Sequence, residues 1–206
     1  NAMDRPMIDQ LLNPGIYPDL TTVVQHLQTH ISHLFLTDRF VYKIKKPVDF
    51  GFLDFTSLEK RRFYCHEELR LNRRLSPDIY LDLVALYQRA DGMLSFQADG
   101  PVVEYAVKMR RMPQERMMSC LLEQGGVTEA DIDAIAKTVA RFHAEAERSN
   151  GIALFGTVEA IRSNWLDNLR QTVPSCARTY PDQAHALITE LAFRRLEPDI
   201  VLVRGR

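Results

Sequence analysis

The sequence predicts an α+β fold in which an antiparallel sheet of about five strands carries one helix and is followed by a mostly helical region. Between residues 31 and 109, short segments alternate apolar and polar side chains, as half-buried strands do. Two of the turns between them contain Asp-Gly, at Asp91-Gly92 and Asp99-Gly100, which is a strong hairpin signal. After Pro113 the apolar residues recur with the period of a helix. A chain of 206 residues suits one domain or two small lobes.

Residues 1–29 are expected to hold a tag remnant and a helical segment. Asn1-Ala2 reads as an expression scar ahead of a natural Met3. From Met7 to Thr29 we expect short helical pieces, because Asn13-Pro14-Gly15 interrupts any longer helix. The sheet is therefore expected to begin at Ile31.

Residues 30–112 are expected to form a lobe made of the sheet and its helix. The capping box Thr56-x-x-Glu59 predicts a helix from Ser57 to Leu75, stopped by Ser76-Pro77. The predicted strands are Ile31–Thr37, Phe40–Lys46, Tyr80–Leu86, Met93–Phe96 and Val102–Met109.

Residues 113–206 are expected to form an incomplete helical lobe. Thr128-x-x-Asp131 caps a long helix. Its apolar stripe consists of Ile132, Ile135, Val139, Phe142 and Ala146. Further predicted elements are the helices Val158–Thr172 and Pro181–Leu196 and the start of a strand at Ile200–Val203.

Composition excludes several classes of function. The 26 basic and 27 acidic residues give a net charge of -1, which argues against a dedicated nucleic-acid-binding protein. No segment approaches ~18 consecutive apolar residues, so no membrane span is expected. The three cysteines lack C-x-x-C spacing and indicate free thiols in a reducing cytoplasm.

The second predicted strand places its lysines on one face. Phe40, Tyr42 and Ile44 share one face, whereas Val41, Lys43 and Lys45 share the other. We expect the first face to pack on the core and the second to look toward a cleft or water. An edge strand protected by lysines is the alternative interpretation.

A glutamate on the following helix is the expected partner of these lysines. Glu68 lies in a mostly apolar stripe with Tyr64, Leu71 and Leu75, where a carboxylate is costly unless a cation pairs with it. Glu68 with Lys43 is the favoured pair. Glu67 remains an alternative to Glu68, and Lys45 to Lys43.

A strand lysine followed by a helix glutamate is how kinase-like folds hold the phosphates of ATP. In a two-lobed kinase, the segment after the last strand is the hinge that contacts the adenine edge. Here that segment contains Met109 and Met112, which would offer apolar surface to the base, and the basic pair Arg110 and Arg111 between them. Core packing is the alternative role of both methionines.

Several motifs resemble the bacterial aminoglycoside-phosphotransferase-like proteins, a family of uncharacterised substrate. The resemblance runs from about residue 22 to residue 206. It implies a protein-kinase-like fold that uses ATP and Mg²⁺ to phosphorylate a small-molecule acceptor. Members often carry a fused P-loop domain, but no G-x-x-x-x-G-K-[ST] occurs here. The matching motifs are Thr29-His30-Ile31-Ser32-His33-Leu34-Phe35-Leu36, Val41-Tyr42-Lys43-Ile44-Lys45-Lys46-Pro47, Gly51-Phe52-Leu53-Asp54-Phe55, Glu68-Leu69-Arg70-Leu71-Asn72, Tyr105-Ala106-Val107-Lys108-Met109 and Ala140-Arg141-Phe142-His143.

The resemblance breaks at the catalytic loop. The superfamily uses His-Gly-Asp-x-x-x-x-Asn and a later Asp for proton acceptance and Mg²⁺ binding, and neither is present. The family order would place them beyond Arg206, so this chain alone is expected to be inactive. The turn Thr37-Asp38-Arg39 lacks the glycines of a phosphate-covering loop. Asp49-Phe50-Gly51 precedes the glutamate helix, so it is a chance match to the kinase metal-binding tripeptide.

Other interpretations remain open. The chain is alternatively a non-catalytic kinase-like module that binds a nucleotide or a protein. The arginine clusters offer a weaker nucleic-acid-binding hypothesis. His26, His30 and His33 have metal-like spacing but no acidic or thiol neighbour, so a structural role is favoured. His143 is expected to be a core histidine.

Overall fold

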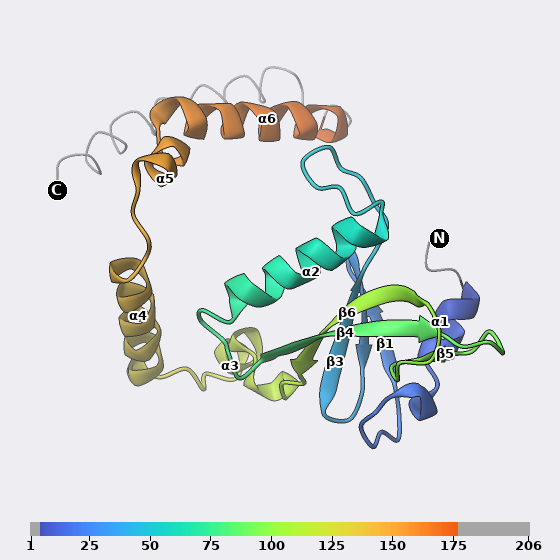
Figure 1. The fold of residues 1–206 in the computed structure, drawn as a ribbon. Helices are drawn as coiled ribbons and strands as arrows, with labels where there is room; N and C mark the ends of the chain where they lie inside the picture. The colour runs from blue at the N-terminus through green and yellow to red at the C-terminus, as the bar shows by residue number, and fades with distance from the viewer. Residues whose placement is uncertain (1–4, 177–206) are drawn as a thin grey trace. The chain divides into compact units, whose positions relative to one another are not determined.

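The computed structural model describes residues 5–176 and shows an α+β fold (Figure 1). The chain divides after Lys137 into two compact units, and this division falls inside the helix α4. The first elements are α1 (Arg5–Leu11), the 3-10 helix η1 (Pro14–Ile16), β1 (Gln25–Gln28), β2 (Ser32–Leu36), β3 (Phe40–Lys45), α2 (Leu58–Asn72), β4 (Tyr80–Gln88), β5 (Leu94–Ser95) and β6 (Val102–Arg110). They are followed by η2 (Gln114–Arg116), α3 (Met118–Glu123), α4 (Glu129–Ala144), α5 (Asn150–Phe155) and α6 (Val158–Cys176).

The six strands form one sheet in the order β1-β2-β3-β6-β4-β5, and neighbouring strands are antiparallel. The strand β6 lies between β3 and β4, so the last strand within residues 5–176 occupies the centre of the sheet. The helix α2 connects β3 to β4 and packs on β6 and β4 (Figure 1). The helix thus follows directly from the lysine-bearing strand.

The predicted count of about five strands is wrong, because β1 forms where short helical pieces were expected. The residues Gln25-His26-Leu27-Gln28 contain a single aliphatic side chain, so their sequence shows little apolar alternation. The strand is at the sheet edge and pairs with β2 alone. Backbone pairing with β2 therefore determines its conformation, and side-chain pattern does not.

The start of α2 also differs from the prediction by one residue. Ser57 is the N-cap and its hydroxyl accepts the Lys60 N–H. Thr56 instead donates its N–H and hydroxyl to Asp54 Oδ1, at 2.9 and 2.6 Å. The capping box was therefore misplaced, because the Thr56 side chain is already used by the preceding loop.

Apolar residues are buried on both faces of the sheet. On one face the N-terminal segment, through Leu11 and Tyr17, covers Phe35, Tyr42 and Ile44. On the other face α2 contributes Cys65 and Leu69, which pack on Val107 of β6 together with Tyr80, Leu83 and Met109. The face that carries Val41, Lys43 and Lys45 was predicted to look toward a cleft or water, but Val41 and Lys45 are buried. The sheet is thus the middle layer of three.

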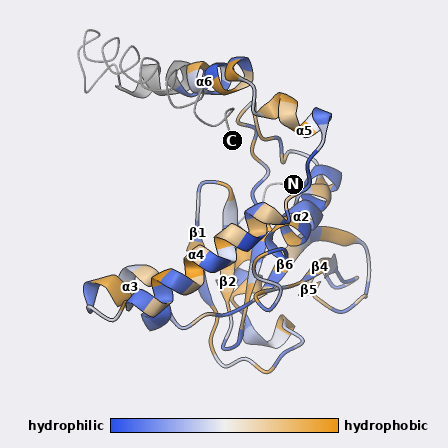
Figure 2. Cartoon of the chain, turned by 90° about the vertical axis from the view of Figure 1, so that its left-hand side faces the viewer, coloured by the Kyte–Doolittle hydropathy of each residue, from blue (hydrophilic) through white to orange (hydrophobic). Residues whose placement is uncertain are grey.

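The helical region begins after Pro113, as predicted, with η2 and α3, and the long helix predicted after them is α4. Thr128 and Asp131 form the expected reciprocal cap, in which Thr128 N–H donates to Asp131 Oδ2 at 2.9 Å and Asp131 N–H donates to Thr128 Oγ1 at 3.3 Å. The helix has hydrophobic and hydrophilic bands (Figure 2), but no residue of it is buried, and His143 is exposed where a core histidine was expected. The predicted elements Pro181–Leu196 and Ile200–Val203 lie outside the described residues. Over residues 5–176, no helix has the length and apolarity needed to cross a membrane.

Two histidines stack inside the β1–β2 hairpin. His26 Nε2 lies 3.0 Å from His33 Nδ1, and the ring of His26 also stacks on Phe35, with centroids 4.9 Å apart. His33 is 7% exposed. Burial lowers the pKa of His33 to about 4, and the charges of Lys46 and His26 act in the same direction. The two rings thus contact each other within the hairpin.

We expect the free energy of unfolding to fall as the pH is lowered from 6.5 toward 4. In this pH range the unfolded chain binds a proton at His33 that the folded chain does not bind. This difference lowers the free energy of unfolding by up to about 3 kcal/mol. His33→Phe should flatten this dependence, whereas His30→Gln, at an exposed position of the adjacent turn, should leave it unchanged. Urea unfolding at several pH values measures the effect. An equal pH slope in wild type and His33→Phe would contradict it.

Candidate functional site

Two lysines of β3 share one carboxylate of α2. Lys43 Nζ donates to Glu68 Oε1 at 2.7 Å, and Lys45 Nζ donates to Glu68 Oε2 at 2.6 Å. The two lysines project from the same face of the strand because they are two residues apart. The predicted pair of Lys43 with Glu68 is therefore present, and the alternative Lys45 is a second partner of the same carboxylate.

This ion cluster is largely removed from water. The exposed fractions of the side chains are 24% for Lys43, 13% for Glu68 and 5% for Lys45. The Lys45 ammonium also lies 4.9 Å from the ring centroid of Phe55. Burial acts to raise the pKa of Glu68, but the hydrogen bonds and charges of Lys43 and Lys45 outweigh it and the pKa lies below its ordinary value. The carboxylate is therefore ionised, and the three groups together carry one positive charge.

The other candidate carboxylate, Glu67, belongs to a surface pair. Its Oε2 accepts from Arg70 Nη2 at 2.7 Å on the exposed side of the same helix. The buried stripe of α2 is Arg61, Cys65 and Leu69, whereas Leu71 and Leu75 of the predicted stripe are exposed. Glu68 thus pairs as predicted, although the buried face of α2 was predicted about one residue away from its observed position.

An apolar surface continues from the lysines along the same face of the sheet. Residues opposite each other on antiparallel strands share a face. In this register Leu34 lies opposite Lys43, and Val41 lies opposite both Leu36 on β2 and Met109 on β6. Leu27 of β1 lies opposite Leu34 and is 57% exposed. We call Leu27, Leu34, Leu36, Val41 and Met109 the apolar strip. Since α2 packs on β6 and β4, much of the strip over β1 and β2 stays accessible.

Sequence reasoning named Met109 and placed Val41 on the face of the lysines, but it missed Leu27, Leu34 and Leu36 of the apolar strip. The alternation of β2 and β3 contained part of the signal, because Val41 is two residues before Lys43. Leu27 could not be placed on this face while β1 was taken as non-strand.

The remaining predicted hinge residues have varied surroundings. Arg110 donates from Nε to the Asp78 carbonyl at 3.1 Å. Arg111 donates from Nη1 to the Thr37 carbonyl at 2.8 Å and from Nη2 to Gln25 Oε1 at 3.2 Å. Met112 is 49% exposed beyond the end of β6. Both arginines therefore bind protein groups that join β6 to its neighbours. Met109 packs partly against the cluster of Cys65, Leu69 and Val107, as its alternative role of core packing predicts, whereas Met112 is exposed.

A turn at the β1–β2 connection lies beside the lysine end of β3. Lys46 N–H donates to the Ile31 carbonyl at 2.8 Å, and Lys46 Nζ donates to the Thr29 carbonyl at 2.7 Å. Ser32 lies opposite Lys45 in the register. This turn, Thr29-His30-Ile31, contains no glycine, and neither does the β2–β3 turn Thr37–Arg39.

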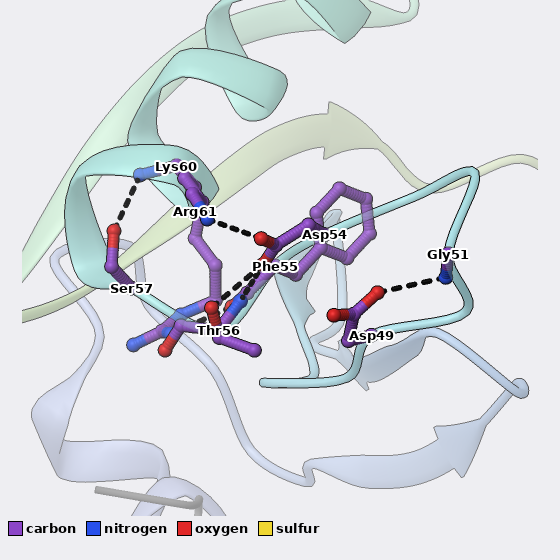
Figure 3. A network of polar contacts seen from close by, with 8 residues as sticks. All are labelled: Asp49, Gly51, Asp54, Phe55, Thr56, Ser57, Lys60 and Arg61. Carbon is purple, nitrogen blue, oxygen red and sulfur yellow. Dashed lines mark hydrogen bonds and ion pairs between the residues drawn. The ribbon is translucent and has the colours of Figure 1, made fainter.

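The tripeptide Asp49-Phe50-Gly51 lies in a hairpin before α2. Asp49 Oδ1 accepts the Gly51 N–H at 2.8 Å, and Gly51 has φ +79° (Figure 3). The Asp49 carboxylate thus stabilises the turn. Across residues 5–176 no group of three or more His, Cys, Asp and Glu side chains is placed to hold a metal ion.

Comparison with known proteins gives relatives but no activity. The chain matches no protein-family model and no solved structure. It is 33% identical over 144 residues to uncharacterized proteins of Mycobacterium bovis and of two strains of Mycobacterium tuberculosis. The match covers 70% of this chain and 27% of each relative. The matched region is thus little more than a quarter of the length of these relatives.

Replacing Glu68 tests the buried cluster. Glu68→Gln leaves the buried ammonium of Lys45 and the partly buried ammonium of Lys43 without a carboxylate, and we expect it to lower the free energy of unfolding by about 3 kcal/mol. Glu67→Gln breaks an exposed pair on the same helix and should cost less than about 1 kcal/mol. Because the folded pKa of Glu68 is depressed, this stabilisation is present above the ordinary value of 4.5 and is lost as the pH falls through the lower folded value.

Urea unfolding of both variants at pH 7 and at pH 3 measures the difference. Equal destabilisation by Glu68→Gln and Glu67→Gln at pH 7 would show that the contact of Glu68 with the two lysines stabilises the fold no more than an exposed ion pair does.

Proposed function

We propose that this chain is the nucleotide-binding, N-terminal part of an ATP-dependent small-molecule phosphotransferase with a kinase-like N-lobe. The observation that carries the proposal is the contact of Lys43 and Lys45 with Glu68. In protein kinases a lysine on the third strand contacts the α- and β-phosphates and pairs with a glutamate of the next helix. Here too the lysines are on the third strand and the glutamate is on the helix that follows it.

The residues present fit the two chemical halves of ATP. The cluster of two ammonium groups and one carboxylate keeps one positive charge, which suits phosphate oxygens. The apolar strip begins beside Lys43 and suits a flat base. In the proposed assignment Lys43 and Lys45 bind phosphate, the strip binds adenine, and the segment Met109–Met112 contributes the hinge.

The proposal for this chain covers binding and not transfer. The sequence contains no His-Gly-Asp-x-x-x-x-Asn loop, so the base and the Mg²⁺ ligands that phosphoryl transfer needs are not assigned here. The acceptor would be a small molecule. A fused or associated P-loop domain is the proposed protein partner, and the cytoplasm, where Cys65 and Cys120 would stay reduced, is the proposed compartment.

The second candidate function is a kinase-like module that binds a nucleotide or a protein without catalysis. Phosphoryl transfer by a longer polypeptide that contains this chain, measured by release of ADP in the presence of candidate acceptors, would separate the two. Transfer that is abolished by Lys43→Ala supports the first. Nucleotide binding without transfer supports the second.

Lys43→Ala is expected to weaken ATP binding by about tenfold or more, which is about 1.4 kcal/mol. The variant removes one ammonium group and leaves Lys45 and Glu68 as a neutral pair. Isothermal titration of ATP into wild type and variant measures the change, with Lys137→Ala at an exposed position of α4 as the control. Unchanged affinity in Lys43→Ala would remove this lysine from the site, and no binding to wild type would refute the proposal.

A further inference from the structure

A second buried ion pair joins α2 to the sheet. Arg61 Nε donates to Glu104 Oε1 and Oε2 at 3.0 and 2.9 Å, and Arg61 Nη2 lies 2.9 Å from Oε2. Both side chains are about as buried as the core, at 4% and 5% exposed. In the sequence Arg61 stands between Lys60 and Arg62, a run of basic residues that is typical of a solvated helix face. Its spacing of four from Cys65 was the signal that it points inward.

The same guanidinium also fixes the loop that leads into the helix. Arg61 Nη1 donates to the carbonyls of Phe55 and Thr56, at 2.9 and 3.1 Å (Figure 3). All three nitrogens of Arg61 are therefore bonded to protein acceptors. The loop, the first turns of α2 and the strand β6 meet at one side chain.

Apolar packing alone fixes α2 weakly. Cys65 and Leu69 are its only buried apolar residues, and non-directional burial of two side chains specifies neither rotation nor axial position of a helix. A bidentate arginine–carboxylate pair is directional and specifies both. At the other end of α2, Arg73 donates to the carbonyls of Tyr80 and Leu81. Polar contacts thus hold the helix at both ends.

Glu68 shares the constraint that Arg61 imposes. The two residues are seven apart, which is about two helical turns and ~10.5 Å along the axis, on nearly the same side. A rotation or a sliding of α2 would separate Glu68 from both lysines. The fixed position of Arg61 on Glu104 prevents these movements.

We propose that Arg61 and Glu104 are positioning residues that hold α2 in register and keep Glu68 on Lys43 and Lys45 when no nucleotide is bound. In this arrangement the site is pre-organised, and nucleotide binding requires no inward movement of the helix. The consequence for ATP rests on the proposed function, but the effect on the lysines does not.

The decisive variant replaces both partners by apolar residues, Arg61→Met with Glu104→Leu. Apolar replacement of a buried ion pair is often neutral or favourable for stability, so the fold is expected to survive while the directional contact is lost. If the double variant does not fold, Arg61→Lys is the second variant, since it keeps the charge and loses the bidentate fork. Glu67→Gln breaks the exposed pair on the same helix and is the matched control.

The first measurement needs no nucleotide. Acetylation rates of individual lysines, followed by mass spectrometry, report how often Lys43 and Lys45 leave Glu68, with the exposed Lys137 as internal reference. In wild type we expect both lysines to react about tenfold more slowly than Lys137, since a lysine reacts only in the fraction of molecules in which it has left Glu68. In the double variant this protection should fall about fivefold or more, with an unchanged thermal midpoint. Glu67→Gln should behave as wild type.

The second measurement is titration with ATP. If the competent position of α2 drops to about a tenth of the population, the apparent Kd rises about tenfold. Unchanged lysine protection in a folded variant would overturn the positioning role, whatever happens to ATP. Lost protection together with no ATP binding to wild type would sustain the positioning role and refute the proposed function.

Discussion

One carboxylate between two lysines is the constraint on which the lysine-bearing lobe depends. Glu68, Lys43 and Lys45 are mostly buried, and a buried charge without a partner costs several kcal/mol. The favourable geometry exists only if β3 and α2 lie at a fixed distance and rotation. In the sheet β6 lies beside β3 and, with β4, forms the surface on which α2 packs. The contact of Glu68 with the lysines therefore couples the candidate site to the position of α2 on the sheet.

The helix that carries Glu68 is held in a different way from an ordinary amphipathic helix. The long helix α4 has a continuous apolar stripe, yet none of its residues is buried. The inner face of α2 has only Cys65 and Leu69 as buried apolar residues, and buried charges hold its place. Arg61 on Glu104 and Glu68 on the lysines are two such contacts, two turns apart. Directional contacts of this kind fix a single register, which suits a helix that has to present one carboxylate to a site.

The sequence predicted the lysine–glutamate contact, because the strand alternation places two cations on one face and a helix carboxylate follows, although Leu71 and Leu75 of the apolar stripe assigned to Glu68 are exposed. The sequence was also sufficient to predict the strands β3 and β6, in which apolar and polar side chains alternate clearly. It was insufficient for β1, whose conformation comes from backbone pairing with β2. It was also insufficient for Arg61, since three adjacent basic residues look solvated until one of them is found to point inward. The contact with Glu104 joins residues 43 positions apart, and no local pattern encodes such a partner.

The second lysine changes the electrostatics of the site. A single lysine with Glu68 would form a neutral pair, and each phosphate oxygen would compete with the carboxylate for one ammonium group. With Lys43 and Lys45 the carboxylate is satisfied by two cations, so either one can turn toward an anion while the other keeps Glu68 bonded. Lys45 is the more deeply buried and lies against Phe55, whereas Lys43 is the more exposed. In the proposed function this difference would divide the roles, with Lys45 holding the helix and Lys43 facing the nucleotide. The excess positive charge beside the apolar strip would then favour a ligand that joins an anionic group to a flat apolar ring over a neutral one.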